Sequence, residues 1–246
     1  MLEAHPSNRR PRSHSGAAAF TLIEVMAALI ILGLLTTLTV SAVGSARHSA
    51  QFSRSTATIR QLGSAALLYT ADHGGNWPRS THSYNASEPQ WALALSGYLL
   101  SEPLRSLYDP RFAVYRESML RDPLDPAEGS GGMQSNRYSY ALNVYLQLDP
   151  ASDDYPGKPA CWHRAPLVPA PGRTVLFASN RQQSSDHFMA HFWAGTGDDL
   201  ADLDRRDEGR AAYVYCDGHV AWQQPSEAFA PDAGINHWNP GQAAQR

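Results

Sequence analysis

The sequence predicts an α+β protein in which one long N-terminal helix packs on a small antiparallel β-sheet. Three observations lead to this prediction. An apolar run begins at Phe20, helical spacing of apolar residues continues to about Asp72, and β-prone segments separated by turn signals follow. The mean hydropathy of −0.39 indicates that most of the 246-residue chain is compatible with water, which excludes a protein with several membrane spans.

Residues 20–43 form an apolar run whose only charged side chain is Glu24. As an α-helix with a rise of about 1.5 Å per residue, this run is about 36 Å long, enough to cross a hydrocarbon core of about 30 Å. Arg9, Arg10 and Arg12 precede the run, and positive residues stay on the cytoplasmic side of a membrane. The run therefore predicts a single membrane span with a cytoplasmic N-terminus.

Two ordinary interpretations of the run leave one residue unexplained. A secretory signal peptide would be cleaved near Gly44-Ser45-Ala46, where small residues follow the apolar run. A plain single-span anchor would keep the run in the mature protein. Neither interpretation accounts for Glu24, because a charge at the centre of a bilayer costs about 3 kcal/mol even on lenient scales and usually has a function.

A third interpretation accounts for the carboxylate. The segment Ala19-Phe20-Thr21-Leu22-Ile23-Glu24-Val25 resembles the processing site of type IV prepilins and of the pseudopilins of type II secretion. In that family, a prepilin peptidase cuts before the Phe on the cytoplasmic face, and the new amino group is N-methylated. The resemblance implies cleavage between Ala19 and Phe20, with Glu24 as the fifth residue of the mature chain. The family usually has Gly before the cut, where this chain has the small residue Ala19.

The resemblance also implies a pilin-like fold and a set of partners. The partners are a prepilin peptidase, other pilin-like subunits in a homo- or hetero-oligomeric filament, and an inner-membrane assembly platform. A buried charge is less costly when it is paired, so Glu24 of one subunit can meet the amino terminus of a neighbour and set the register between them. The implied location is the inner (cytoplasmic) membrane, as a single-pass protein with a periplasmic, extracytoplasmic head.

Helical spacing continues beyond the membrane-spanning run. The Gly74-Gly75 pair and Pro78 predict that the helix ends near Asp72. The apolar stripe of this outer half is formed by Phe52, Ser55, Ile59, Leu62, Ala66 and Tyr69. The expected organisation is a leader peptide at 1–19, a transmembrane half-helix at 20–43, an extracytoplasmic half-helix at 44–72, a head at 73–224 and an irregular tail at 225–246.

The strongest local signal in the head is the β-prone segment 211–223. Asp217-Gly218 between its two arms predicts a hairpin with a two-residue type I′ turn. Its register pairs Cys216 with His219 and Tyr213 with Trp222. The face that is expected to pack in the core, against the long helix, carries Tyr213, Tyr215, Val220 and Trp222.

Other head segments strengthen the resemblance. A short helix is expected at 91–100, a turn at 122–126, and strands at 138–146 and 173–178. Pseudopilin-like proteins of planctomycete and verrucomicrobial bacteria have an Asp-Pro turn, an S-Y-A-x-N strand, a P-x-x-T-x-L-F strand and a terminal D-G-H-V hairpin in this order. The matching segments here begin at Asp122, Ser139, Pro171 and Asp217, and Asp122 stands where those proteins often have Cys.

The sequence contains no convincing catalytic, metal or cofactor site, so the chain is not expected to be an enzyme. His187 and His191 have a spacing that can hold a metal on a helix, but no Glu follows His187, so the metalloprotease motif is absent. An acidic loop could bind calcium or remain solvated, and its spacing matches no calcium-loop motif. Its carboxylates are those of Asp198, Asp199, Asp202 and Asp204. The nearly balanced net charge of −3 argues against binding of nucleic acid.

Cys161 and Cys216 are the two cysteines of the chain. On the oxidising side of a membrane such a pair can form a disulfide, and two free, partly buried thiols are the alternative.

Two classes of function follow from these features. The first is a pilin-like structural subunit, assembled into a type II secretion pseudopilus or a type IV pilus-like filament. The alternative is a membrane-tethered extracytoplasmic binding or enzymatic domain that uses the N-terminal segment for export. The F-T-L-I-E segment and the missing catalytic constellation favour the first class.

Overall fold

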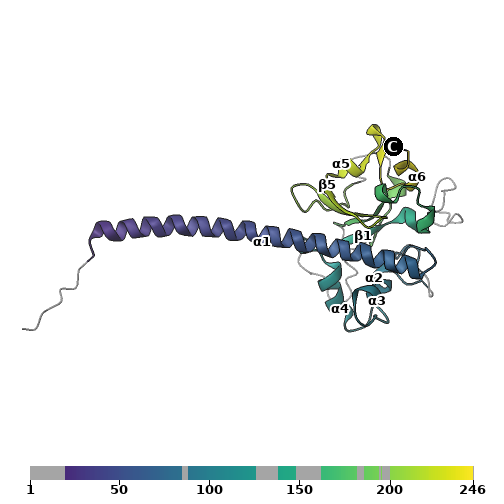
Figure 1. Cartoon of the computed structure of the whole chain (residues 1–246), viewed down its shortest axis with the longest axis horizontal. Coiled ribbons are helices and arrows are strands. Elements are labelled where there is room, and N and C mark those ends of the chain that lie inside the picture. The colour runs from purple at the N-terminus through teal and green to yellow at the C-terminus, as the bar shows by residue number, and fades with distance from the viewer. Residues whose placement is uncertain are drawn as a thin grey trace, which may run out of the picture. The chain divides into compact units, whose positions relative to one another are not determined.

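The computed structural model describes residues 20–84, 88–125, 138–147, 162–181, 186–193, 195 and 200–245. The chain divides into two compact units, Met1–His48 and Ser49–Arg246. The helix α1 runs from Leu22 to Asp72, close to the predicted bounds, and contributes residues to both units. The second unit also contains a five-stranded sheet and several short helices (Figure 1). The α+β, pilin-like fold class is therefore confirmed.

The sheet of the second unit is mixed rather than wholly antiparallel. Its strand order is β3-β1-β2-β4-β5, and every neighbouring pair is antiparallel except β1 with β3. The chain reverses direction after β2 and returns on the far side of β1, so that β3 runs the same way as β1. The strands are β1 (Tyr140–Asn143), β2 (Val175–Ser179), β3 (His187–Phe188), β4 (Ala211–Tyr215) and β5 (Val220–Gln223).

Short helices and turns make up much of the remaining described chain. The helix expected at 91–100 is present as two single turns, and the strand expected at 138–146 ends in a 3-10 turn. The helices are α2 (Trp91–Ala94), α3 (Ser96–Leu99), α4 (Phe112–Tyr115), α5 (Pro225–Ala228) and α6 (Pro240–Ala243), with a π-helical turn η1 (Arg116–Leu120) and 3-10 turns η2 (Val144–Leu146), η3 (Ala165–Leu167), η4 (Pro171–Arg173), η5 (Ala190–Phe192) and η6 (Pro231–Ala233).

The C-terminal segment differs from the irregular tail that was expected. It contains α5, α6 and a two-stranded ribbon of β6 (Phe229–Ala230) and β7 (Ile235–Asn236). Trp238 is fully buried, with its ring centroid 4.9 Å from that of Phe188 and 6.2 Å from that of Tyr213. The side-chain amide of Asn143 donates to the carbonyl oxygen of Trp238 at 2.8 Å. This segment therefore extends the core of the second unit.

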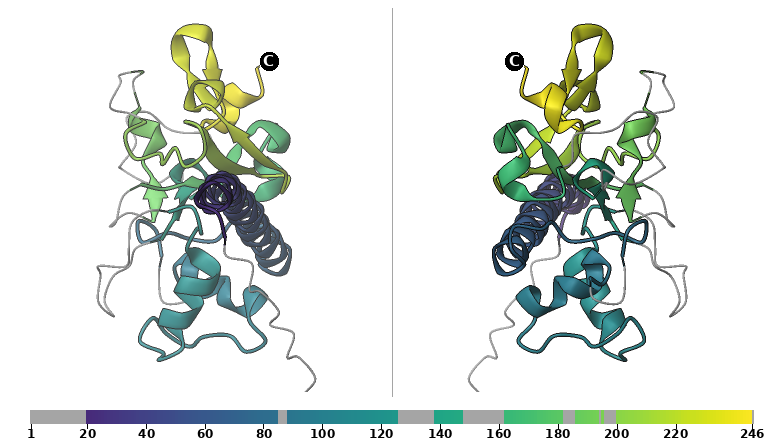
Figure 2. Two further views of the ribbon diagram at one scale, coloured as in Figure 1. Left: turned by 90° about the vertical axis from the view of Figure 1, so that its left-hand side faces the viewer. Right: turned by 90° about the vertical axis from the view of Figure 1, so that its right-hand side faces the viewer.

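Within the second unit, α1 lies between the sheet and the short helices. The two views in Figure 2 agree that the strands cover one side of this part of α1 and that α2, α3 and α4 cover another. Its buried stripe matches the stripe predicted from the sequence except at Phe52, which is half-buried. The buried residues are Ser55, Ile59, Leu62, Gly63, Ala65, Ala66, Tyr69 and Thr70.

The β4–β5 hairpin has a register one residue away from the predicted one. Tyr213 pairs with Ala221 rather than with Trp222, and Val214 pairs with Val220. Because side chains alternate between the two faces of a strand, this slip places Tyr213 and Trp222 on opposite faces. The expectation that Tyr213, Tyr215, Val220 and Trp222 share the face against the long helix is therefore wrong.

The slip originates in the turn, which contains three residues rather than two. The amide of Tyr215 donates to the carbonyl oxygen of His219 at 3.0 Å, so residues 216–218 form the loop. Asp217 Oδ1 accepts the amide of His219 at 3.0 Å, which stabilises this longer loop. Gly218 has a φ of 90°, the left-handed position at the end of such a loop. The prediction of a type I′ turn is therefore wrong, although Gly218 does have the positive φ that this prediction required.

The face of the hairpin that packs on α1 carries Val214 and Trp222. The indole Nε1 of Trp222 donates to Thr56 Oγ1 at 2.9 Å, and the Trp222 ring centroid lies 4.8 Å from that of Phe52. Gly63 allows helix and strand to approach closely, because a Cβ at this position would lie 2.5 Å from Val214 Cγ2. The register of the hairpin therefore decides which side chains meet α1.

Replacement of Gly218 by Val should destabilise the second unit. A β-branched residue at positive φ is strained by about 1–3 kcal/mol. A new Cβ would also lie 2.8 Å from Leu67 Cδ1. Thermal unfolding of the full chain in detergent, followed by tryptophan fluorescence, measures the loss. Gly218→Asn is the control, because Asn tolerates positive φ and should lose less stability. Equal stability of Gly218→Val and the unchanged chain would refute the turn geometry.

Candidate functional site

The first candidate site is the start of α1, where Thr21 and Glu24 cap the helix. The amide and hydroxyl of Thr21 donate to Glu24 Oε2 at 2.8 and 2.9 Å. The amide of Glu24 in turn donates to Thr21 Oγ1 at 3.3 Å. This reciprocal pair is a capping box, which satisfies backbone donors that the first turn of a helix leaves without partners. The Thr21–Glu24 segment, which carries the resemblance to prepilins, therefore also forms the N-terminal cap of the helix.

The apolar half of α1 follows this capping box directly. Among the described helices, α1 alone is long and apolar enough to cross a membrane. None of the residues in its most apolar segment is buried against the rest of the chain. Leu29, Leu32 and Leu38 are among its exposed apolar residues. Burial of such surface needs lipid or other copies of the helix, because apolar side chains are driven out of water. One apolar N-terminal helix fits a single-pass membrane anchor.

The structure places the predicted site residues in different environments. Phe20 is 83% exposed and lies immediately before the capping box, whereas Ala19 lies outside the described residues. Cys161 also lies outside them, so the Cys161–Cys216 disulfide stays a prediction. Cys216 is buried, which raises the pKa of its thiol well above the ordinary value and keeps an unpaired thiol protonated at neutral pH.

The histidines noted in the sequence do not form a metal site in the described part of the chain. His187 lies in β3 and His191 in the 3-10 turn η5, so the helical i, i+4 geometry is absent. The Nδ1 atom of His187 lies 2.8 Å from Asp186 Oδ1. His219 stacks on the ring of Tyr215 with a centroid distance of 4.4 Å, which fits a packing role in the hairpin.

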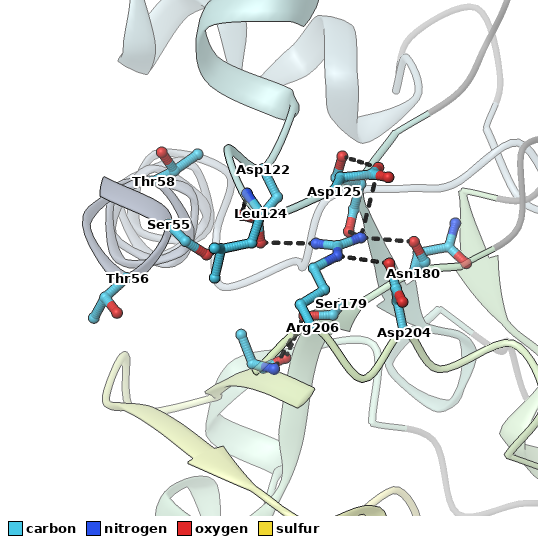
Figure 3. A network of polar contacts seen from close by, with 12 residues as sticks. Ser55, Thr56, Thr58, Asp122, Leu124, Asp125, Ser179, Asn180, Asp204 and Arg206 are labelled. Atoms are coloured by element: carbon cyan, nitrogen blue, oxygen red, sulfur yellow. Dashed lines mark hydrogen bonds and ion pairs between the residues drawn. The ribbon is translucent and has the colours of Figure 1, made fainter. Parts of the chain in front are cut away.

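The second candidate site is a buried polar network centred on Arg206 (Figure 3). The Arg206 side chain is fully buried, and its Nη1 and Nε donate to Asp122 Oδ2 and Asp204 Oδ2, each at 2.7 Å. Its Nη2 donates to the carbonyl oxygens of Ser139 and Asn180 at 2.9 and 2.8 Å. These bonds use all three nitrogens of the guanidinium group, which is the geometry for which arginine is suited.

Asp122 connects this network to α1. The hydroxyl of Ser55, on the buried stripe of α1, donates to Asp122 Oδ2 at 2.7 Å. The amide of Leu124 donates to Asp122 Oδ1 at 2.8 Å, so the turn itself holds the carboxylate in place. Both Asp122 and Arg206 have side chains with no exposed surface. A hydrogen bond from the helix and an ion pair from the loop before β4 therefore converge on one buried carboxylate.

A third carboxylate and an aromatic ring complete the surroundings of Arg206. Asp125 Oδ2 lies 3.7 Å from Arg206 Nη2 and accepts the hydroxyl of Ser139 at 2.7 Å. The Arg206 guanidinium carbon lies 5.7 Å from the centroid of the Tyr140 ring, within cation–π distance. Burial lowers the pKa of Arg206, but Asp122 and Asp204 more than offset this effect and raise its net value. The neighbouring carboxylates therefore compensate the positive charge of the buried Arg206 side chain.

The sequence indicates the pieces of this network but not Arg206. The Asp122–Asp125 turn, the Ser139 strand and the acidic loop with Asp204 are each visible in it as separate features. Asp204 is not simply solvated, because it pairs with Arg206, while Asp198 and Asp199 lie outside the described residues. The only signal for Arg206 in the sequence is its position beside the acidic loop. Spacing along the chain cannot show that it contacts Asp122, which lies 84 residues away.

Replacement of Arg206 by Met should lower the free energy of unfolding by about 3–5 kcal/mol, the cost of leaving a buried charge without its partner. Chemical denaturation of the full chain in detergent tests this. Arg205→Met is the matched control, since Arg205 is exposed and its loss should change stability by less than about 0.5 kcal/mol. Equal effects of the two substitutions would contradict the network's role.

Comparison with known proteins bears on the first site. A family model described as the prokaryotic N-terminal methylation motif matches residues 14–40. No curated protein and no solved structure matches the chain. The matched residues include Phe20, Thr21 and Glu24 and the apolar start of α1, and the proteins that carry this motif have structural roles. The match supports placing the chain among the type IV prepilin-like proteins.

Proposed function

We propose that the chain is a pilin-like structural subunit, a pseudopilin, that is cleaved between Ala19 and Phe20, N-methylated at Phe20, and assembled into a type II secretion pseudopilus or a type IV pilus-like filament. The observation that carries this proposal is the methylation motif over residues 14–40, combined with a single carboxylate at the head of an apolar helix. The partners would be a prepilin peptidase, other pilin-like subunits and an inner-membrane assembly platform.

The capping geometry leaves Glu24 able to contact a neighbour. Both hydrogen bonds from Thr21 go to Oε2, and a carboxylate has about four acceptor positions on its two oxygens. Glu24 can therefore cap its own helix and accept the ammonium group of another subunit at the same time. Cleavage before Phe20 would create that ammonium group within the apolar region, where pairing lowers the cost of both charges. This contact would set the axial register between subunits.

The exposed face of α1 in the second unit offers a continuous surface for assembly. Exposed residues recur at alternating spacings of four and three, the repeat of a seam between parallel helices. Small side chains at several of these positions would let another helix approach closely. The seam consists of Ala50, Arg54, Ala57, Gln61, Ser64, Leu68 and Ala71. This face is suited to contact with the helix of another subunit, as the filament proposal requires.

Replacement of Glu24 should block assembly but not processing. Glu24→Ala removes both the charge and the helix cap, whereas Glu24→Gln keeps an acceptor for Thr21 and removes only the charge. Both variants should insert into the membrane and be cleaved, because a neutral residue enters lipid more easily than a carboxylate. If the charge sets the register, both variants should be missing from sheared filament fractions of the native host.

The pair of variants also separates the two roles of this carboxylate. Incorporation of Glu24→Gln at the level of the unchanged chain would contradict the charge-pairing proposal and leave only helix capping. Normal incorporation of Glu24→Ala as well would contradict any role for this residue in assembly and would favour a membrane-tethered domain that borrows the segment for export.

A further inference from the structure

The capping box at the start of α1 also decides which residues lie outside the helix. The hydroxyl oxygen of Thr21 accepts the amide of Glu24 at 3.3 Å. In a helix that began earlier, the same amide would donate to the carbonyl oxygen of Phe20, four residues before it. The first main-chain bond of α1 runs instead from the amide of Val25 to the carbonyl oxygen of Thr21, at 3.2 Å. The Thr21 hydroxyl therefore takes the place that the Phe20 carbonyl would have in a longer helix.

This helix start leaves Phe20 accessible. α1 begins at Leu22, and 83% of the Phe20 surface is exposed. Proteases cut where the backbone is exposed and free of regular hydrogen bonds, whereas a peptide bond inside a helix has its N–H and C=O groups engaged along the helix. The proposed cleavage releases the backbone nitrogen of Phe20. A helix that begins two residues later keeps this nitrogen outside the helical hydrogen-bond ladder.

The sequence before the proposed cleavage site favours a longer helix. Residues 17–19 are three alanines, and alanine is the strongest helix former. Ser15 precedes them and is a good N-cap residue, so the sequence offers a second helix start there. Amides without partners are costly in an apolar environment, and an added turn would supply carbonyl oxygens to the amides of the present first turn. A start at Leu22 therefore needs a specific signal, and the capping box supplies it.

We propose that Thr21 is a positioning residue for processing: by capping α1 through the Glu24 amide, its hydroxyl keeps the Ala19–Phe20 bond out of the helix and presents it to the peptidase. The inference rests on the proposed function and deepens it, because it names a residue that determines how well the leader is cut. Cleavage should then follow the capping strength of residue 21 rather than the shape of its side chain. Glu24→Ala keeps this hydrogen bond, since the donor is the backbone amide, and is therefore still expected to be cut.

A cleavage assay on a series of Thr21 variants tests this role. The full-length precursor is incubated with detergent-solubilised membranes of the native host, which contain the peptidase, and the mature chain is followed by mass. Thr21→Val keeps the side-chain shape but has no capping oxygen, whereas Thr21→Ser and Thr21→Asn keep one. We expect kcat/KM of Thr21→Val to fall about fivefold, which corresponds to about 1 kcal/mol for a lost N-cap. The change should lie in KM, because a smaller fraction of the precursor has the exposed site. Thr21→Ser and Thr21→Asn should be cut at least as fast as the unchanged chain.

Thr36→Val is the matched control. The Thr36 hydroxyl donates to the carbonyl oxygen of Leu32 at 2.7 Å, so this variant also loses a threonine hydroxyl of α1 but leaves the helix start unchanged. It should be cut at the rate of the unchanged chain. A second measurement reads the helix start without the peptidase. In detergent micelles, Thr21→Val should move the carbon-13 Cα chemical shifts of residues 17–19 toward helical values, and Thr36→Val should not.

Three results would overturn the role of Thr21. The first is cleavage of Thr21→Val at the rate of the unchanged chain. The second is slow cleavage of Thr21→Ser and Thr21→Asn together with Thr21→Val, because the peptidase would then recognise threonine itself. The third is slow cleavage of Thr21→Val without a shift of the helix start. The unchanged precursor separates the two levels of the proposal: if it is not cut between Ala19 and Phe20, the proposed function itself fails, whereas if it is cut there, the variants report on Thr21 alone.

Discussion

The ion pair between Arg206 and Asp122 is the interaction on which the second unit depends. It joins the loop before β4 to the turn after η1, and Ser55 adds α1 to the same carboxylate. A buried ion pair contributes little net stability, but it strongly disfavours any packing in which one charge loses its partner. The network therefore selects one axial position of α1 against the sheet. Gly63 acts in the same sense, because a helix shifted by a turn would place a larger side chain against Val214.

Glu24 lies in the first unit, at the start of the same helix. A capped helix start with spare acceptor capacity suits contact with a neighbouring amino terminus. The proposed assembly thus rests on two carboxylates, one that fixes α1 within the subunit and one that would fix α1 between subunits.

The sequence predicted features that depend on local chemistry and missed those that depend on distant contacts. Helix α1, the stop near Asp72 and the positive φ of Gly218 follow from apolar spacing and glycine chemistry, and all are present. The hairpin register was wrong because Asp217 stabilises a three-residue loop, a choice that an Asp-Gly pair alone does not reveal. The partners of Arg206 come from four separate segments, and no spacing rule connects them.

In the proposed function, the mature subunit begins with Phe20, the residue that precedes the capping box. The mass and fragmentation spectrum of the N-terminal peptide, from protein isolated from membranes of the native host, tests this directly. We expect a peptide that starts at Phe20 and carries one methyl group on its amino nitrogen. A mature protein that starts after Ala46, or one that keeps the complete leader of residues 1–19, would contradict it.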